Sequence, residues 1–131
     1  MPEPQMQEYT TEIRVRYSDC DPMGFLHHSR YFIYFEIART EMYRACGGDY
    51  AEMERSGHFF VVVSAESHYR KPAHYDDVLQ ITVRLEKVTR VKLVHAYEVR
   101  CNGELLTEAK TTLAMVDREG RVVLIPDDLQ I

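Results

Sequence analysis

The sequence lacks the long apolar run that a membrane-spanning helix needs. No apolar stretch approaches the roughly 20 residues that cross a bilayer. The opening residues, MPEPQMQEYTTEIRVRYSD, also lack the basic segment and apolar core of a secretory signal. We therefore expect no membrane span, and we expect the cytoplasm as the location.

Cysteine is sparse, and its spacing does not suit a disulfide framework or a structural zinc site. The three cysteines, an odd number without a CxxC pair, are Cys20, Cys46 and Cys101. A metal site built from Asp19, Asp21 and His28 is the one alternative, but that spacing matches no established ligand pattern. We therefore predict no metal site.

An excess of positive charge is missing as well. The chain has 16 basic and 21 acidic residues, which give a formal net charge of -5. Because nucleic-acid binding draws largely on basic groups that contact phosphate, we expect no nucleic-acid partner. A small phosphorylated ligand stays compatible with this composition, since two or three local cations suffice to bind it.

What is present is the composition of an ordinary globular protein. The chain has 131 residues, of which 45% are hydrophobic and 28% charged, and it shows no internal repeat or low-complexity segment. This length suits one domain with a modest core, so we expect a single domain over residues 1–131.

The first half of the chain predicts one strand and one long helix. β-Branched and aromatic residues favour a strand over 9–17, which the turn-forming residues of 19–24 then end. We expect a helix over 29–46, with Ser29 as its N-cap and the glycine pair 47–48 as its stop. Helical spacing places these residues on its buried stripe: Tyr31, Phe35, Ala38, Met42, Ala45 and Cys46.

In the second half the hydrophobic period changes from 3.6 to 2. After a short helix over 50–56, we expect strands over 59–70, 78–88, 91–101, 105–116 and 121–125. The dipeptide Asn102-Gly103 is typical of a two-residue type I′ hairpin turn. Because short connections make these strands antiparallel, we predict an α+β domain with one antiparallel sheet around one helix. One helix covers only one sheet face, which favours self-association.

The stretch YSDCDPMGFLHHSRYF, residues 17–32, gathers titratable side chains just before the predicted helix. The first N–H groups of a helix have no partner within it, and they lie at the positive end of its dipole. Such donors stabilise a carbonyl oxygen that gains negative charge during acyl transfer. A carboxylate beside them, for which Asp21 is the candidate, can attack that carbonyl or activate a water molecule.

Plainer interpretations of the same residues stay open. Asp19 and Asp21 can be turn residues whose carboxylates bind local backbone amides. His27 and His28 can have packing or surface roles, and Cys20 can be a small buried hydrophobe.

The same stretch resembles the opening motif of the hot-dog-fold acyl-CoA thioesterases of the 4-hydroxybenzoyl-CoA thioesterase type. In that family a strand ends in an aromatic residue and is followed by Asp-Cys/Thr-Asp, a glycine-containing turn and the long central helix. Three further stretches are similar to the family's helix, middle and closing segments: YFIYFEIARTEMYRACG, YRKPAHYDDVLQITVRL and LAMVDREGRVVLIP. The resemblance implies a five- or six-stranded antiparallel sheet wrapped around one long helix, in subunits that form dimers or tetramers.

The resemblance also implies roles for individual residues. Asp21 matches the catalytic carboxylate, which serves as nucleophile or as general base. The backbone N–H near His28 matches the oxyanion donor, and the His28 imidazole could assist the leaving thiolate or position water. Tyr17 occupies the aromatic position beside the motif and is expected to line the pocket, while Asp19 is expected to hold the loop.

A coenzyme A substrate brings phosphates, which basic side chains bind. The resemblance places phosphate contacts near LEKVTRVKL, so the candidates are Arg90 and Lys92, with Arg70 and Lys71 behind them. The alternative for all four is a purely solvated role. Coenzyme A is here part of the substrate, so no separate cofactor is expected.

The resemblance thus implies a thioester hydrolase that acts on a short-chain or aromatic acyl-CoA. The acyl group, the number of subunits, and acyl carrier protein as the alternative thiol stay open. Two competing functions are a hot-dog hydratase, whose typical central motif is not found here, and a non-catalytic module that binds acyl-CoA or acyl carrier protein.

Overall fold

The computed structural model of the protein describes residues 8–130. Its helices are α1 (Tyr31–Ala45) and α2 (Tyr50–Arg55), and its 3₁₀ turns are η1 (Tyr17–Asp19), η2 (His28–Arg30) and η3 (Asp127–Leu129). Its strands are β1 (Glu8–Arg14), β2 (Phe59–Tyr69), β3 (Val78–Val88), β4 (Lys92–Cys101), β5 (Glu104–Val116) and β6 (Val122–Val123).

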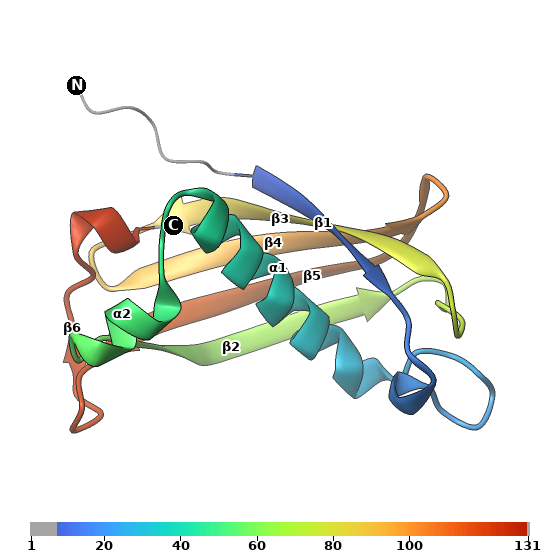
Figure 1. Ribbon diagram of the computed structural model, residues 1–131, viewed down its shortest axis with the longest axis horizontal. Helices are drawn as coiled ribbons and strands as arrows, with labels where there is room; N and C mark the ends of the chain where they lie inside the picture. Colours follow the sequence, from blue (N-terminus) through green and yellow to red (C-terminus); the bar gives the residue numbers. More distant parts are fainter. Residues whose placement is uncertain (1–7, 131) are drawn as a thin grey trace.

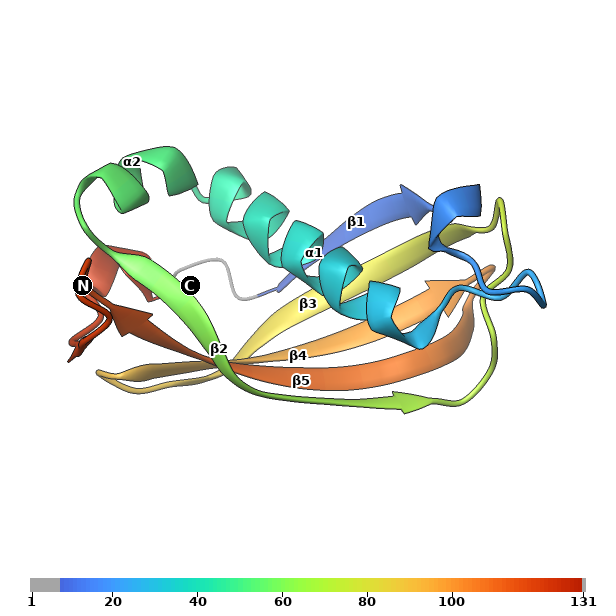
Figure 2. The same cartoon turned by 90° about the horizontal axis from the view of Figure 1, so that it is seen from below.

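The strands form one antiparallel sheet in the order β1-β3-β4-β5-β2, and β6 pairs with the end of β5. Helix α1 lies diagonally across one face of this curved sheet, which bends around it (Figures 1 and 2). The α+β prediction of one long helix and five or six antiparallel strands is therefore confirmed.

The alternation of apolar and polar residues in the sequence corresponds to a buried and an exposed face of the sheet. On β3 the apolar residues Leu79, Ile81 and Val83 are fully buried beneath α1, whereas the residues between them are polar. The hairpin between β4 and β5 has positive φ at both Asn102 (52°) and Gly103 (81°), which a type I′ turn requires. The predicted hairpin is thus confirmed.

The start of the long helix differs from the prediction. Residues 28–30 form the 3₁₀ turn η2, and α1 begins only at Tyr31. Ser29 does not cap a helix; instead its N–H donates to Nδ1 of His27, 3.2 Å away. At the other end the helix stops as expected, because Gly47 has a φ of 88° that a helix cannot continue.

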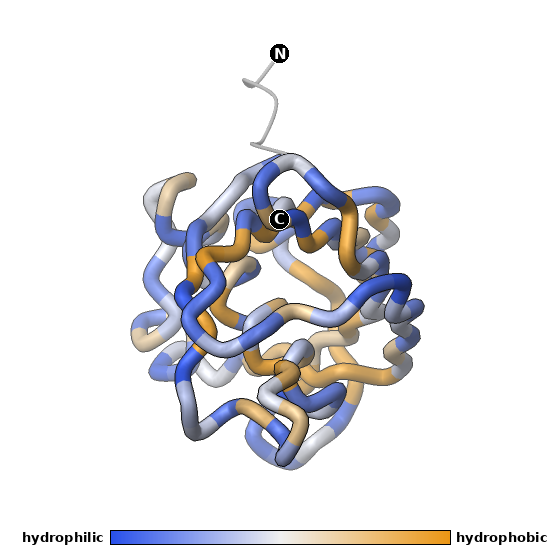
Figure 3. Tube along the Cα trace, turned by 90° about the vertical axis from the view of Figure 1, so that its right-hand side faces the viewer, coloured by the Kyte–Doolittle hydropathy of each residue, from blue (hydrophilic) through white to orange (hydrophobic). Residues whose placement is uncertain are grey.

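The core lies between α1 and the sheet. There the ring of Phe35 of α1 stacks on the ring of Tyr97 of β4, with centroids 4.5 Å apart. The predicted stripe is largely buried, but Ala45 is exposed, whereas Tyr34 and Tyr43 are buried instead. Viewed from the end that carries residues 17–28, hydrophobic stretches lie largely on the inside of the chain trace (Figure 3).

Strand β2 forms one edge of the sheet, and its hydrogen-bonding groups on that side face no other described strand. It also exposes apolar side chains, with Val62 53% and Val63 51% exposed. An edge strand of 11 residues with exposed valines is a ready surface for pairing with another strand.

Candidate active site

The loop before α1 folds back on itself through a tight turn. The Asp21 N–H donates to the Phe25 carbonyl (2.8 Å), and the Gly24 N–H donates to the Asp21 carbonyl (2.9 Å). Gly24 has a φ of 78°, a conformation that favours glycine. This turn brings the two segments on either side of it together, since Cys20 and Leu26 form a β-bridge.

The carboxylate of Asp21 is oriented by this same turn. Its Oδ1 accepts hydrogen bonds from the backbone N–H groups of Met23 (2.9 Å) and Phe25 (3.1 Å). Oδ1 of Asp21 thus binds local backbone amides, as in the alternative interpretation of Asp21 as a turn residue. Oδ2 takes part in none of the hydrogen bonds or ion pairs within residues 8–130, so one oxygen of a fixed carboxylate stays available.

A cleft of about 300 Å³ lies at the start of α1, and Asp21 and His28 both line it. The other lining residues are Phe25, Leu26, Tyr31, Tyr69, Arg70, Lys71 and Pro72. The cleft therefore combines a carboxylate, an imidazole, two cations and an apolar wall. It lies beside the electropositive end of the long helix.

The His28 backbone supplies a free donor at this end. The His28 N–H donates no hydrogen bond to any acceptor among residues 8–130. The His28 carbonyl accepts a hydrogen bond from the hydroxyl of Tyr69, 3.1 Å away. The His28 ring stacks on that of His27, with centroids 4.3 Å apart.

Asp19, two residues before Asp21, is 4% exposed and anchors the loop to α1. Its Oδ2 accepts hydrogen bonds from the Tyr34 hydroxyl (2.7 Å) and from Nε of Arg16 (3.3 Å), and Arg30 lies 3.8 Å from its Oδ1. Its carbonyl accepts from the His27 N–H at 2.9 Å. These contacts match the expected loop-holding role.

The environment of Asp19 favours its charged form. Burial alone would raise the pKa of Asp19, but the hydrogen bonds from Tyr34 and Arg16 and the two nearby guanidinium charges hold it below its usual range. Burial and the adjacent carboxylate raise the pKa of Tyr34. The pair is therefore a phenol donating to a carboxylate.

Tyr17 does not join this cleft. Its side chain is 80% exposed, and its ring packs edge-on against that of Tyr75, with centroids 5.6 Å apart. The structure places Tyr17 in η1 rather than at the end of a strand, because β1 ends at Arg14. Its predicted role in the pocket stays a prediction.

The four candidate cations fall into two groups. Arg70 and Lys71 line the cleft, where each forms an ion pair: Nε of Arg70 lies 2.9 Å from Glu108, and Nζ of Lys71 lies 2.8 Å from Glu104. The second group comprises Arg90 and Lys92. These lie at the far end of β3, whose 11 residues span about 33 Å at about 3.3 Å per residue.

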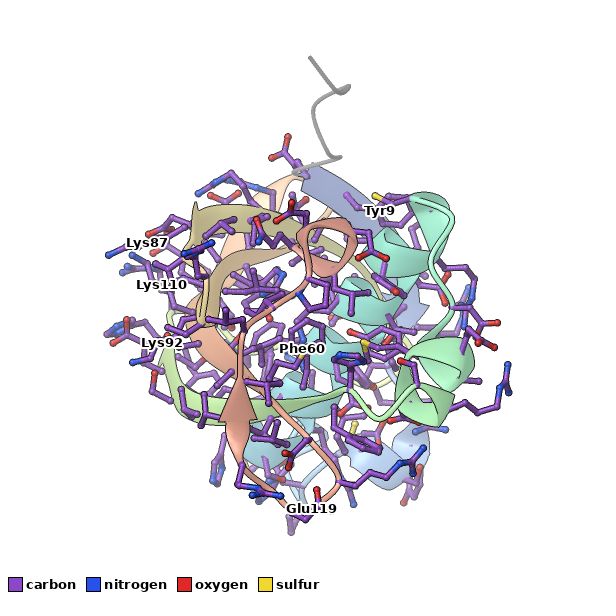
Figure 4. The ribbon with its side chains drawn as sticks, turned by 90° about the vertical axis from the view of Figure 1, so that its left-hand side faces the viewer. Tyr9, Phe60, Lys87, Lys92, Lys110 and Glu119 are labelled. Atoms are coloured by element: carbon purple, nitrogen blue, oxygen red, sulfur yellow. The ribbon has the colours of Figure 1, made fainter. Side chains whose placement is uncertain are left out.

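This far end is rich in cations. Lys87 and Lys92 lie near this end and project outward on the same side of the sheet as Lys110, which lies midway along β5 opposite Ala96 (Figure 4). Lys110 pairs with Glu86 at 2.7 Å, whereas Lys87, Arg90 and Lys92 have no ion pair with any residue of 8–130. Within one subunit these cations lie about the length of β3 away from the cleft beside Asp21.

Two other features of the described residues bear on function. Among them no three His, Cys, Asp or Glu side chains are grouped so as to hold a metal ion. No helix within this part of the chain is long and apolar enough to cross a membrane.

Sequence reasoning missed two aromatic residues of the cleft wall, Tyr31 and Tyr69. Their rings lie 5.0 Å apart, although 38 positions separate them in the chain. The helical spacing predicts only a core position for Tyr31. Tyr69 is the last residue of β2 and directly precedes the two candidate cations at 70–71. This position in the sequence is the signal that could have pointed to Tyr69 as a residue of the cleft.

The family model of the thioesterase-like superfamily matches residues 15–131. The chain belongs to this superfamily. Among curated relatives, a provisionally named esterase of Aquifex aeolicus is 36% identical over 116 residues, which cover 88% of this chain and 90% of that protein. The acyl-CoA thioester hydrolase YbgC of Escherichia coli is 32% identical over 106 residues, covering 80% and 79%. The prediction of a thioester-hydrolase family is thereby confirmed.

Solved structures of thioesterases share the fold. A DHNA-CoA thioesterase from Staphylococcus aureus matches with a TM-score of 0.88 and 30% identity, covering 91% of this chain and 81% of that one. A mutant 4-hydroxybenzoyl-CoA thioesterase complexed with 4-hydroxybenzoyl-CoA matches with a TM-score of 0.86 at 22% identity, covering 95% of this chain and 96% of that one, which supports the fold alone. The hot-dog prediction is confirmed.

Proposed function

We propose that this member of the thioesterase-like superfamily hydrolyses the thioester of an acyl-CoA in the cleft at the start of α1. One observation carries the proposal: an oriented carboxylate, Asp21, and an unpartnered backbone N–H, that of His28, border the same cleft at the positive end of the helix. Relatives named acyl-CoA thioester hydrolases support the choice of substrate.

In the proposed reaction the thioester carbonyl lies between these two groups. The His28 N–H donates to its oxygen and stabilises the negative charge that develops there. Asp21 then either attacks the carbonyl carbon, giving an anhydride that water cleaves, or takes a proton from a water molecule that attacks directly. In both routes the C–S bond breaks, coenzyme A leaves as a thiolate, and the His28 imidazole stabilises that thiolate.

The apolar wall of the cleft suits the uncharged part of the substrate. Phe25, Leu26, Tyr31 and Tyr69 offer apolar surface beside the reacting groups. Excluding water there strengthens the electrostatic interactions within the cleft.

The proposed enzyme is a homo-oligomer whose subunits pair through β2. Two antiparallel β2 strands related by a two-fold axis bring the start of one strand beside the end of the other. Residue pairing places Lys92 opposite Ala114 of β5, and Ala114 opposite Val61 near the start of β2. Pairing of this kind therefore carries the β3–β4 turn of one subunit toward the Tyr69 end of the other.

Such pairing gives Arg90 and Lys92 a place in the site. Three strand spacings separate the cleft from Arg90 of the partner subunit: β4 to β5, β5 to β2, and β2 to the β2 strand of the other subunit. At about 4.8 Å between neighbouring strands, this distance is about 15 Å. The pantetheine arm of coenzyme A extends from the thioester toward its phosphates. We infer that Arg90 and Lys92 bind these phosphates across the subunit interface, while Arg70 and Lys71 act from within the subunit.

The test is a panel of thioesters with free thiol as the readout. We expect thiol release from aromatic or short-chain acyl-CoA, with long-chain acyl-CoA and acyl carrier protein thioesters as parallel arms. An enoyl-CoA assayed for hydration separates the hydratase alternative. Tight binding without thiol release across the panel, or hydration instead of release, would contradict the proposal.

A further inference from the structure

Tyr69 connects the edge strand of the sheet to the turn that precedes α1. It is the last residue of β2, and its hydroxyl donates to the His28 carbonyl over 3.1 Å. Its ring contacts Tyr31 (centroids 5.0 Å apart) and approaches the His28 ring edge-on (6.5 Å). One side chain thus meets both the backbone and the imidazole of the residue that the proposed reaction uses.

The His28 residue has few other fixed points. Its N–H is unpartnered among residues 8–130, and its side chain stacks on His27 without a hydrogen bond to it. The nearby hydrogen bond from a backbone N–H to Nδ1 of His27 comes from Ser29, not from His28. The tyrosine hydroxyl is therefore the side-chain contact that ties the His28 backbone to the sheet.

We propose that Tyr69 is a positioning residue for thioester hydrolysis, because its hydroxyl holds the His28 backbone where the N–H of that residue meets the thioester oxygen. This inference rests on the proposed function. The geometry of an oxyanion donor matters steeply, since a displacement of about 1 Å can cost about 100-fold in rate. A single hydrogen bond to the carbonyl of the same residue restrains that displacement.

The position of Tyr69 gives this contact a second consequence. Strand β2 is the open edge of the sheet, and Tyr69 lies at its end with 44% of its surface exposed. Any partner strand that pairs along β2 also fixes where this residue lies. Subunit pairing along β2 would therefore also affect the direction of the His28 N–H, through the Tyr69 hydroxyl.

The experiment compares Tyr69→Phe with Tyr75→Phe in the full-length protein. Both substitutions remove only a hydroxyl, and Tyr75 is an exposed tyrosine that packs on Tyr17 outside the cleft. We expect Tyr69→Phe to lower kcat by about 3- to 10-fold, the range that one lost hydrogen bond gives, with KM within twofold of wild type. We expect Tyr75→Phe to leave both constants within twofold.

A second readout does not depend on activity. The amide nitrogen of Ser29 belongs to the peptide group whose carbonyl Tyr69 binds, so its ¹⁵N chemical shift should move in Tyr69→Phe and not in Tyr75→Phe. An unmoved shift, an unchanged kcat, or a change in KM alone would each overturn the inference. If the wild-type protein releases no thiol, the proposed function itself fails, and the Ser29 shift still reports whether Tyr69 holds the turn.

Discussion

The two ends of α1 carry two clefts of opposite character. At its start lies the cleft of about 300 Å³ with Asp21 and His28. Beyond its end lies a larger cleft of about 580 Å³, whose wall carries the carboxylates of Asp49, Glu52 and Asp128. The larger cleft has the negative end of the helix dipole beside it.

Charge rather than volume favours the cleft at the start of α1 as the proposed site. A substrate with phosphates, and a transition state with an oxyanion, are both repelled by three carboxylates and a helix C-terminus. At the start of α1 the same groups meet an unpartnered N–H and the side chains of Arg70 and Lys71.

The two ends also differ in how they are held. The start is tied by two tyrosine hydroxyls, since Tyr34 binds Asp19 and Tyr69 binds the His28 carbonyl. The end is held by backbone hydrogen bonds, such as that from the Gly48 N–H to the Tyr43 carbonyl (2.9 Å), and by the close approach of Gly48 to the Tyr43 ring. The side-chain hydrogen bonds at the start fix groups of the proposed site, whereas the contacts at the end stop the helix.

The largest effect is expected from Asp21→Asn. An amide has neither the basicity nor the nucleophilicity of a carboxylate, so kcat should fall by about 100-fold or more. The matched control is Asp128→Asn in the cleft at the other end, which should stay within twofold of wild type. Thiol release from acyl-CoA measures both. If Asp21→Asn retains a rate within a few-fold of wild type, Asp21 is not the catalytic carboxylate and the cleft at the start of α1 loses its main support as the site.

A smaller effect is expected from removing the cations of the β3–β4 turn. The double substitution Arg90→Ala and Lys92→Ala should raise KM for acyl-CoA by about five- to tenfold, with kcat little changed and with a weaker dependence of KM on salt. Arg55→Ala, which removes a cation from α2 outside the β3–β4 turn, is the control and should change neither constant. An unchanged KM in the double variant would mean that these two cations are solvated.

Tyr34→Phe should reduce stability at the start of α1. The loss of a hydrogen bond to a buried carboxylate should lower the free energy of unfolding at pH 7 by about 1–3 kcal/mol, measured by urea denaturation with Tyr75→Phe as control. Because the folded-state pKa of Asp19 is depressed, its stabilisation is present above about pH 4 and is lost as pH falls below that value. The difference between variant and wild type should therefore shrink in acid; a pH-independent difference would argue against this account.

The smallest effect on activity is expected from Gly48→Ala. A Cβ added there would lie 2.2 Å from the Tyr43 ring, so the ring must shift, and the free energy of unfolding should fall by about 1–3 kcal/mol. The rate per folded molecule should stay within twofold of wild type, because the substitution lies at the end of α1 that has no part in the proposed reaction. A large fall in kcat would show that the two ends are coupled.

Local patterns predicted most of the elements because they depend on near neighbours. Alternation along residues 78–88 reproduces β3, and the Asn102-Gly103 dipeptide reproduces its hairpin. The helix start was predicted less well, since the cap expected from Ser29 is made by His27 through a 3₁₀ turn. Capping depends on where a side chain points, and periodicity carries no such information.

By itself the sequence determined the order of elements, the single helix, the antiparallel pairing and the placing of Asp21 before that helix. Only the tertiary structure decided which distant residues share the cleft. The Tyr69 hydroxyl reaches a carbonyl 41 positions away, and Arg90 lies a strand's length from Asp21 in the same subunit. The physical reason is that periodicity reports on neighbours within a turn or a strand, whereas the site depends on strand order and register across the sheet.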